Sequence, residues 1–157
     1  MKYKLSSLIV VFLFILLVAL APVPAQSDAF ECAIRILEPR PGQEVASRIK
    51  VEGTASIPDG YHLWVFARRS DFQPLWWSQG EGTVDAKTGK WSAFATLGVP
   101  EDVSYDFDLT VAIVVREQYL QLRDNLLKAM KSGEFRPTEI PAAACVAGAV
   151  KVKKTKQ

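Results

Sequence analysis

Apolar and polar residues alternate with a period of two along most of this chain, and this period constrains the fold more than any other feature. The clearest run covers residues 107–115, where every second residue from Phe107 is apolar and Asp108 and Thr110 lie between them. Such alternation is typical of a β-strand with one buried and one exposed face. The chain is therefore predicted to be all-β, with this run as a central strand.

About seven short strands are predicted. They cover residues 32–36, 48–55, 61–68, 75–78, 91–97, 107–115 and 144–153. Turn residues separate them at Pro58-Asp59-Gly60, Lys87-Thr88-Gly89 and Gly98-Val99-Pro100. Short strands at this spacing, without helices between them, favour a two-sheet sandwich over a parallel α/β fold.

One segment, residues 117–132, has helical spacing instead. Its apolar residues are Tyr119, Leu120, Leu122, Leu126, Leu127 and Met130. Gly133 follows in the position that ends a helix. We therefore expect one helix inserted before the last strand. This stripe is too broad to stay in water, so the helix either covers one sheet as a lid or binds a partner.

The first 25 residues resemble no part of a folded domain. Lys2 and Lys4 precede an uninterrupted apolar run at residues 8–20, and Val23-Pro24-Ala25 supplies small residues at a cleavage site. This pattern is typical of a secretory signal peptide, and cleavage is expected after Ala25. The alternative is an uncleaved anchor. Residues 26–157 are then a single exported domain, which is secreted, periplasmic or at the cell surface.

The charge balance of the mature chain excludes a general attraction to polyanions. The whole chain has 19 Lys and Arg against 17 Asp and Glu. Because Lys2 and Lys4 belong to the signal segment, residues 26–157 carry 17 of each. We therefore expect no nucleic-acid partner, and membrane contact only through a retained signal segment; any electrostatic attraction must be local.

The two cysteines, Cys32 and Cys145, lie near the two ends of the mature chain. An exported protein meets an oxidising compartment, and the pair lacks metal-site spacing. A Cys32–Cys145 disulfide is therefore predicted. It would place the first and last strands side by side.

Ile36, Pro39, Gly42 and Val45, followed by the alternation through Val51, Gly53 and Ala55, carry a family resemblance. This opening resembles bacterial immunoglobulin-like and fibronectin-type-III-like domains, in which a proline-glycine bend joins the first two strands. The resemblance implies an immunoglobulin-like sandwich used for adhesion, recognition or spacing. The terminal cysteines and the inserted helix depart from antibody-type domains, so no loop residues are carried over.

An aromatic cluster is the best candidate for a binding site. In the predicted strand 61–68, Leu63, Val65 and Ala67 are expected to enter the sandwich, so that Trp64 and Phe66 face either the helix or a ligand. Trp76 and Trp77 are adjacent and should point to opposite faces, which leaves at least one exposed. The candidate binding residues are Trp64, Phe66, Arg68, Trp76 and Trp77.

Residues that could support catalysis are few. His62 is the only histidine and lies in an apolar strand, so multi-histidine metal sites are excluded and a serine triad is disfavoured. The carboxylates form either a solvated edge or a calcium site, and their spacing favours the edge; they are Glu101, Asp102, Asp106 and Asp108. Neither a Walker-type loop nor a nucleophile elbow is present. We expect no enzyme activity, no metal and no cofactor.

Two classes of function fit these observations. The first is an exported, non-enzymatic interaction or structural module of the cell envelope, which binds a protein through the aromatic sheet face or the helix. The alternative is a carbohydrate-binding module that uses an exposed tryptophan, Trp76 or Trp77.

Overall fold

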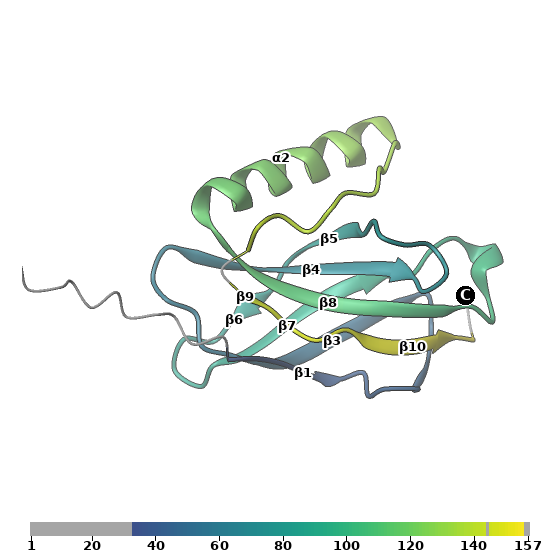
Figure 1. The fold of residues 1–157 in the computed structure, drawn as a ribbon, viewed down its shortest axis with the longest axis horizontal. Helices are drawn as coiled ribbons and strands as arrows, with labels where there is room; N and C mark the ends of the chain where they lie inside the picture. Colours follow the sequence, from purple (N-terminus) through teal and green to yellow (C-terminus); the bar gives the residue numbers. More distant parts are fainter. Residues whose placement is uncertain (1–32, 144, 156–157) are drawn as a thin grey trace, which may run out of the picture.

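The computed structural model describes residues 33–143 and 145–155, which form two β-sheets with one long helix on the outer face of one sheet (Figure 1). The four-stranded sheet has the order β1 (Ile34–Glu38), β3 (Arg48–Ala55), β7 (Lys90–Thr96), β6 (Thr83–Val84). The six-stranded sheet has the order β2 (Glu44–Val45), β10 (Val150–Lys154), β8 (Asp106–Val115), β4 (Tyr61–Arg69), β5 (Trp77–Glu81), and β9 (Cys145–Val146) pairs with β8. The remaining elements are a short 3-10 helix, η1 (Pro100–Asp102), and the helix α2 (Arg116–Ser132).

The two-sheet β-sandwich with a helix before the final strands is confirmed, but the predicted number of strands is wrong. Ten strands are present in the described residues. Two of the extra strands, β2 and β6, have two residues each, which is too short for alternation to be visible in a sequence. The third arises because the predicted strand 144–153 is divided into β9 and β10.

The space between the two sheets holds the main hydrophobic core. β4 contributes Leu63, Val65 and Ala67, as the alternation predicted, and β7 contributes the large ring of Trp91. Gly53 of β3 lies against that ring, because a Cβ atom there would be 2.7 Å from it and would overlap the carbonyl oxygen of Arg35. The close approach of β1, β3 and the Trp91 ring therefore requires glycine at this position.

A second core lies between the six-stranded sheet and α2. It consists of Trp64, Phe66, Trp76, Ala112, Val114 and Leu122, with Tyr119, Leu126, Ile140 and Ala143 packed against it. β8 is therefore buried on both faces over most of its length. This corrects the expectation of one exposed face, because α2 and the segment after it cover the side that alternation assigned to solvent.

The helix α2 follows directly from β8 and agrees with the predicted segment 117–132. It ends at Gly133, whose backbone is left-handed (φ 75°) and whose N–H donates to the carbonyl oxygen of Ala129 at 2.8 Å. Leu122 is its buried contact with the sheet, and Tyr119 and Leu126 are half-buried. The helix therefore acts as a lid on β4, β5 and β8, although part of its apolar stripe stays exposed.

The first and last strands are not hydrogen-bonded neighbours, contrary to prediction. β1 pairs with β3 in one sheet, whereas β10 pairs with β8 and, in parallel, with β2 in the other. The chain changes sheets between β1 and β2 at the bend around Gly42, whose N–H donates to the carbonyl oxygen of Lys151 at 2.8 Å. Cys145 is buried in β9, but Cys32 lies outside the described residues, so their disulfide stays a prediction.

The predicted signal segment, residues 1–25, also lies outside the described residues. Among the residues that are described, no helix is both long enough and apolar enough to span a bilayer.

Candidate interaction surface

Trp64 and Phe66, two of the candidate binding residues, lie beneath α2. Trp64 is 1% exposed, and its indole N–H donates to Ser78 Oγ at 2.7 Å. Its ring meets the Tyr119 ring edge-on, with 5.8 Å between the ring centroids. The rings of Trp64 and Phe66 are therefore part of the second core, and a partner cannot reach them while α2 is in place.

His62, at the start of β4, also contacts the helix. Its ring stacks on Tyr119, with centroids 3.8 Å apart and planes 9° apart, and its Nδ1 lies 3.0 Å from Glu81 Oε1. This contact holds the first turn of α2 against the start of β4. The only histidine of the chain therefore has a structural environment, as its place in an apolar strand suggested.

Arg68 belongs to a nearly buried polar network. Its Nε donates to Asp108 Oδ2 at 3.1 Å, and the hydroxyl of Ser70 donates to Asp108 Oδ1 at 2.8 Å. The guanidinium also lies over the Trp76 ring, 4.1 Å from its centroid. Each charged group thus has a partner inside the fold, which leaves Arg68 with little capacity for an external ligand.

The adjacent tryptophans differ in environment, but neither is fully exposed. Trp76 is buried in the second core, and its backbone forms a two-hydrogen-bond bridge with Thr138. Trp77 is half-buried, with its ring 5.0 Å from that of the exposed Phe72. Alternation therefore separates the two indoles, and Trp77 is the one within reach of a ligand.

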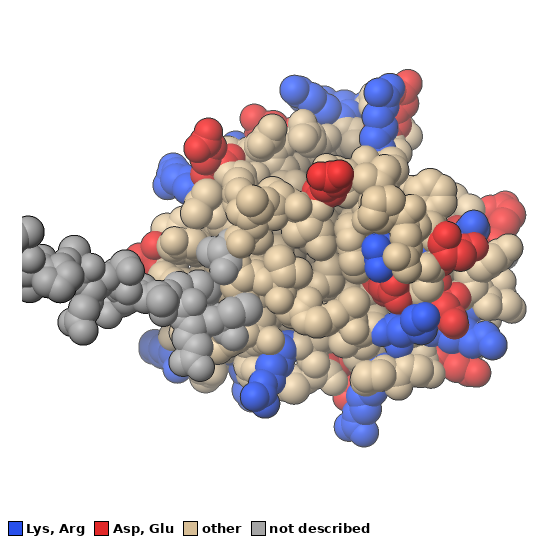
Figure 2. All heavy atoms as spheres, in the orientation of Figure 1, with Lys and Arg blue, Asp and Glu red and all other residues tan. Residues whose placement is uncertain are grey.

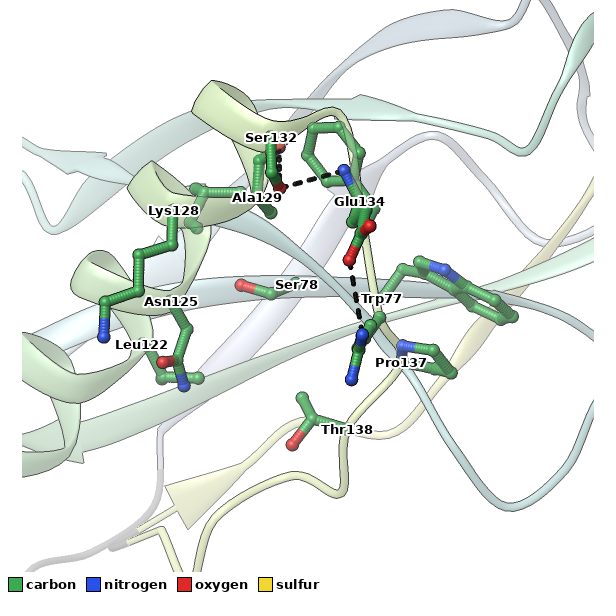
Figure 3. Close-up of a pocket in the computed structure, with 13 residues that line it drawn as sticks. Trp77, Ser78, Leu122, Asn125, Lys128, Ala129, Ser132, Glu134, Pro137 and Thr138 are labelled. Carbon is green, nitrogen blue, oxygen red and sulfur yellow. Dashed lines mark hydrogen bonds and ion pairs between the residues drawn. The ribbon is translucent and has the colours of Figure 1, made fainter.

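A groove of about 410 Å³ lies between α2, β5 and the segment that follows the helix (Figure 3). One wall is formed by the α2 residues Leu122, Asn125 and Ala129, and Ser78 lies across from them on β5. The opposite wall is the segment 134–138, which the bridge between Thr138 and Trp76 joins to the sheet. The groove thus forms where α2 and the segment that follows it meet β5, which is distant from both in sequence.

The rim of the groove combines charged and apolar side chains. Glu134 and Arg136 form an exposed ion pair at 3.2 Å, and Lys128 stands on the helix side. Phe135, between the paired residues, is 54% exposed. Sequence reasoning did not select the segment 134–138, because it has no periodicity; the one available signal was an aromatic residue between opposite charges just before Pro137.

The exposed flank of α2, formed by Leu127 and Met130, is turned away from the sheet. These side chains are 48% and 65% exposed. They belong to the predicted apolar stripe, which is wider than the surface that the sheet can cover. Figure 2 shows that the broad area of the visible face with few charged residues lies below α2, whereas Lys, Arg, Asp and Glu side chains stand along the top, where Figure 1 places the helix.

The predicted carboxylate edge serves the fold. Asp102 accepts a hydrogen bond from Val99 N at 2.9 Å and from Arg69 at 2.8 Å. Partial burial raises the pKa of Asp102, but these hydrogen bonds and the guanidinium charge outweigh burial and lower that pKa below its ordinary value. Among the described residues, no group of three or more His, Cys, Asp or Glu side chains is placed to hold a metal ion.

Comparison with protein-family models and with curated proteins gave no match to this chain. The geometry of the described residues is therefore the basis for any functional conclusion.

Proposed function

We propose that the mature chain is an exported, non-enzymatic interaction module of the cell envelope that binds a protein partner through α2 and the groove beside it. The signal-like residues 1–25 support export. The observation that carries the proposal is the exposed flank of α2, since Leu127 and Met130 remain in water on a helix that packs on the sheet through the buried Leu122. Exposed apolar side chains within a rim of charged residues are typical of protein-binding surfaces, and the exposed Arg123, Asp124 and Lys131 are neighbours of this pair on the helix.

The strand order supports a more specific fold, an immunoglobulin-like sandwich. In such domains strands A, B, E and D form one sheet, and G, F, C and an added C′ form the other. The sheet orders β1-β3-β7-β6 and β10-β8-β4-β5 follow this pattern. The tryptophan on β4 departs from it, because Trp64 packs under α2, whereas the inter-sheet core is filled by Trp91 from β7.

The proposed partner is an envelope or extracellular protein that inserts an apolar side chain into the groove and packs against the exposed flank of α2. Phe135 supplies an exposed aromatic anchor at the rim of the groove. Lys128 and Arg136 favour a partner with acidic groups beside its apolar residue. Trp64 and Phe66 then act indirectly, by holding α2 in position.

Site-specific photo-cross-linking in the exported protein tests this proposal. A photo-reactive amino acid is placed at Leu127 or Phe135 and, as a control, at the exposed Thr83 on β6. Positions 127 and 135 should give adducts with the same second protein, and position 83 should not. Absence of adducts from both test positions, or equal adducts from position 83, would contradict the proposal.

A second candidate function is carbohydrate binding at the Phe72–Trp77 pair. This candidate is favoured by one observation, the contact of the half-buried Trp77 ring with the exposed Phe72 ring. Phe72→Ala, which removes a ring that does not line the groove, should then abolish retention on a glycan array while the exported protein keeps its cross-linked partner. Unchanged retention would contradict the carbohydrate-binding candidate and leave protein binding as the only proposal.

A further inference from the structure

The outer face of the four-stranded sheet carries an excess of positive charge that the rest of the mature chain lacks. Alternate residues of β3 and β7 point away from the core, since Ile49, Val51, Ala93 and Ala95 point into it. The side chains on the outer face therefore include four basic residues: Arg35, Arg48, Lys50 and Lys90. Because residues 26–157 are neutral as a whole, this is a local concentration of charge.

Few carboxylates offset these cations. Glu52 forms an ion pair with Lys50 at 2.7 Å, and Glu38 pairs with Arg40 at 3.1 Å. Asp85 lies near Lys90 in the adjoining turn, but its two oxygens accept hydrogen bonds from Lys87 N and the Thr88 hydroxyl. Among the described residues, Arg35 and Arg48 have no carboxylate partner within ion-pair distance.

An aromatic ring lies within this basic face. Phe94 of β7 is 58% exposed and stands directly across from Lys50 of β3 in the strand register. The guanidinium of Arg48 lies 5.1 Å from the centroid of the Phe94 ring. A flat apolar surface and a free cation are therefore presented together on a rigid pair of strands, which seven residue pairs join.

We infer that this face, hereafter the basic face, binds an acidic polysaccharide whose sugar rings carry carboxylates. The non-polar face of one sugar ring stacks on Phe94 and its carboxylate pairs with Arg48, whereas Arg35, which lies across from Thr54 at the other end of β3, pairs with the carboxylate of a sugar further along the polysaccharide. A membrane surface fits less well, because membrane binding requires several apolar side chains on the same face and Leu37 and Phe94 are the only large exposed ones on β1, β3 and β7. The site is on the opposite sheet from α2 and is independent of the proposed protein partner.

The test is binding of the mature protein to polygalacturonate, with fully methyl-esterified polygalacturonate as the uncharged equivalent. The wild type should bind the acid form and lose affinity as salt is added, and the ester should bind about tenfold more weakly or not at all. Arg35→Ala combined with Arg48→Ala should weaken binding by about tenfold. Phe94→Ala should weaken binding by about fivefold, whereas Phe94→Tyr, which keeps the ring, should bind like the wild type.

Two matched controls separate this face from non-specific charge. Lys128→Ala combined with Arg136→Ala removes the same charge from the α2 side, and Phe135→Ala removes an equally exposed ring. Both should leave the affinity within twofold of the wild type. The inference is overturned if a control weakens binding as much as its counterpart, if the ester binds equally well, or if anionic lipid vesicles compete as well as oligogalacturonate.

Discussion

Replacing Leu122 by alanine should lower the free energy of unfolding by about 2 to 3 kcal/mol, because this side chain is the main contact between α2 and the sheet. Leu122 is 7% exposed and packs in the second core with Trp64, Phe66 and Val114. Buried leucine-to-alanine changes cost about 2 to 5 kcal/mol. The lower part of that range applies here, since Leu122 also lines the groove and the space it leaves opens towards solvent.

The matched control is Leu127→Ala on the same helix. The two substitutions change helix propensity equally, but Leu127 is 48% exposed. We expect Leu127→Ala to change stability by less than about 0.5 kcal/mol. The difference between the two variants therefore isolates the burial of α2 against the sheet.

Urea unfolding followed by tryptophan fluorescence measures the free energy of unfolding of both variants, with Trp64 as a reporter of the second core. When the protein is unfolded by heat instead, the melting temperature of Leu122→Ala should be lower than that of the wild type by roughly 6 to 12 °C. Equal, small effects of the two substitutions would refute the reasoning. They would mean that α2 contributes nothing to the stability of the sandwich and that Trp64 and Phe66 are accessible to a partner.

Three further outcomes follow from the structure. Gly53→Ala should destabilise the fold by about 3 kcal/mol or more, measured by urea unfolding, because the added Cβ has no space beside Trp91. The lowered pKa of Asp102 stabilises the fold above the unfolded-state pKa of about 4, and this contribution is lost as pH falls further. The difference in free energy of unfolding between the wild type and Asp102→Asn should therefore disappear in acid, and a difference that stays constant with pH would contradict this. Non-reducing peptide mapping should find Cys32 joined to Cys145, and recovery of two free thiols would contradict that pairing.

Elements with a strong local pattern were predictable from the sequence. The strand predicted at 48–55 is β3, and the helix predicted at 117–132 differs from α2 by one residue at its start. Both patterns span several periods, and Gly133 marks the end of the helix through its own backbone preference. Two-residue strands such as β2 exist only because a partner strand lies beside them, so no local pattern announces them.

The candidate site was only partly predictable for the same reason. Alternation along β4 showed that Trp64 and Phe66 leave the inter-sheet core, but not what would cover them. Their burial depends on α2 folding back over β4, which is a contact between distant parts of the chain. The groove depends further on the bridge between Thr138 and Trp76, in a segment without periodicity.

The distribution of charge shows the division between sequence and tertiary structure most clearly. The sequence alone determined that residues 26–157 have no net charge, because that is a count of residues. The antiparallel register of β3 and β7 decided that Lys50 and Phe94 face each other, beside Arg48. A neutral chain can present a basic surface because folding places residues on a face by their pairing across strands, and that pairing is fixed by long-range packing.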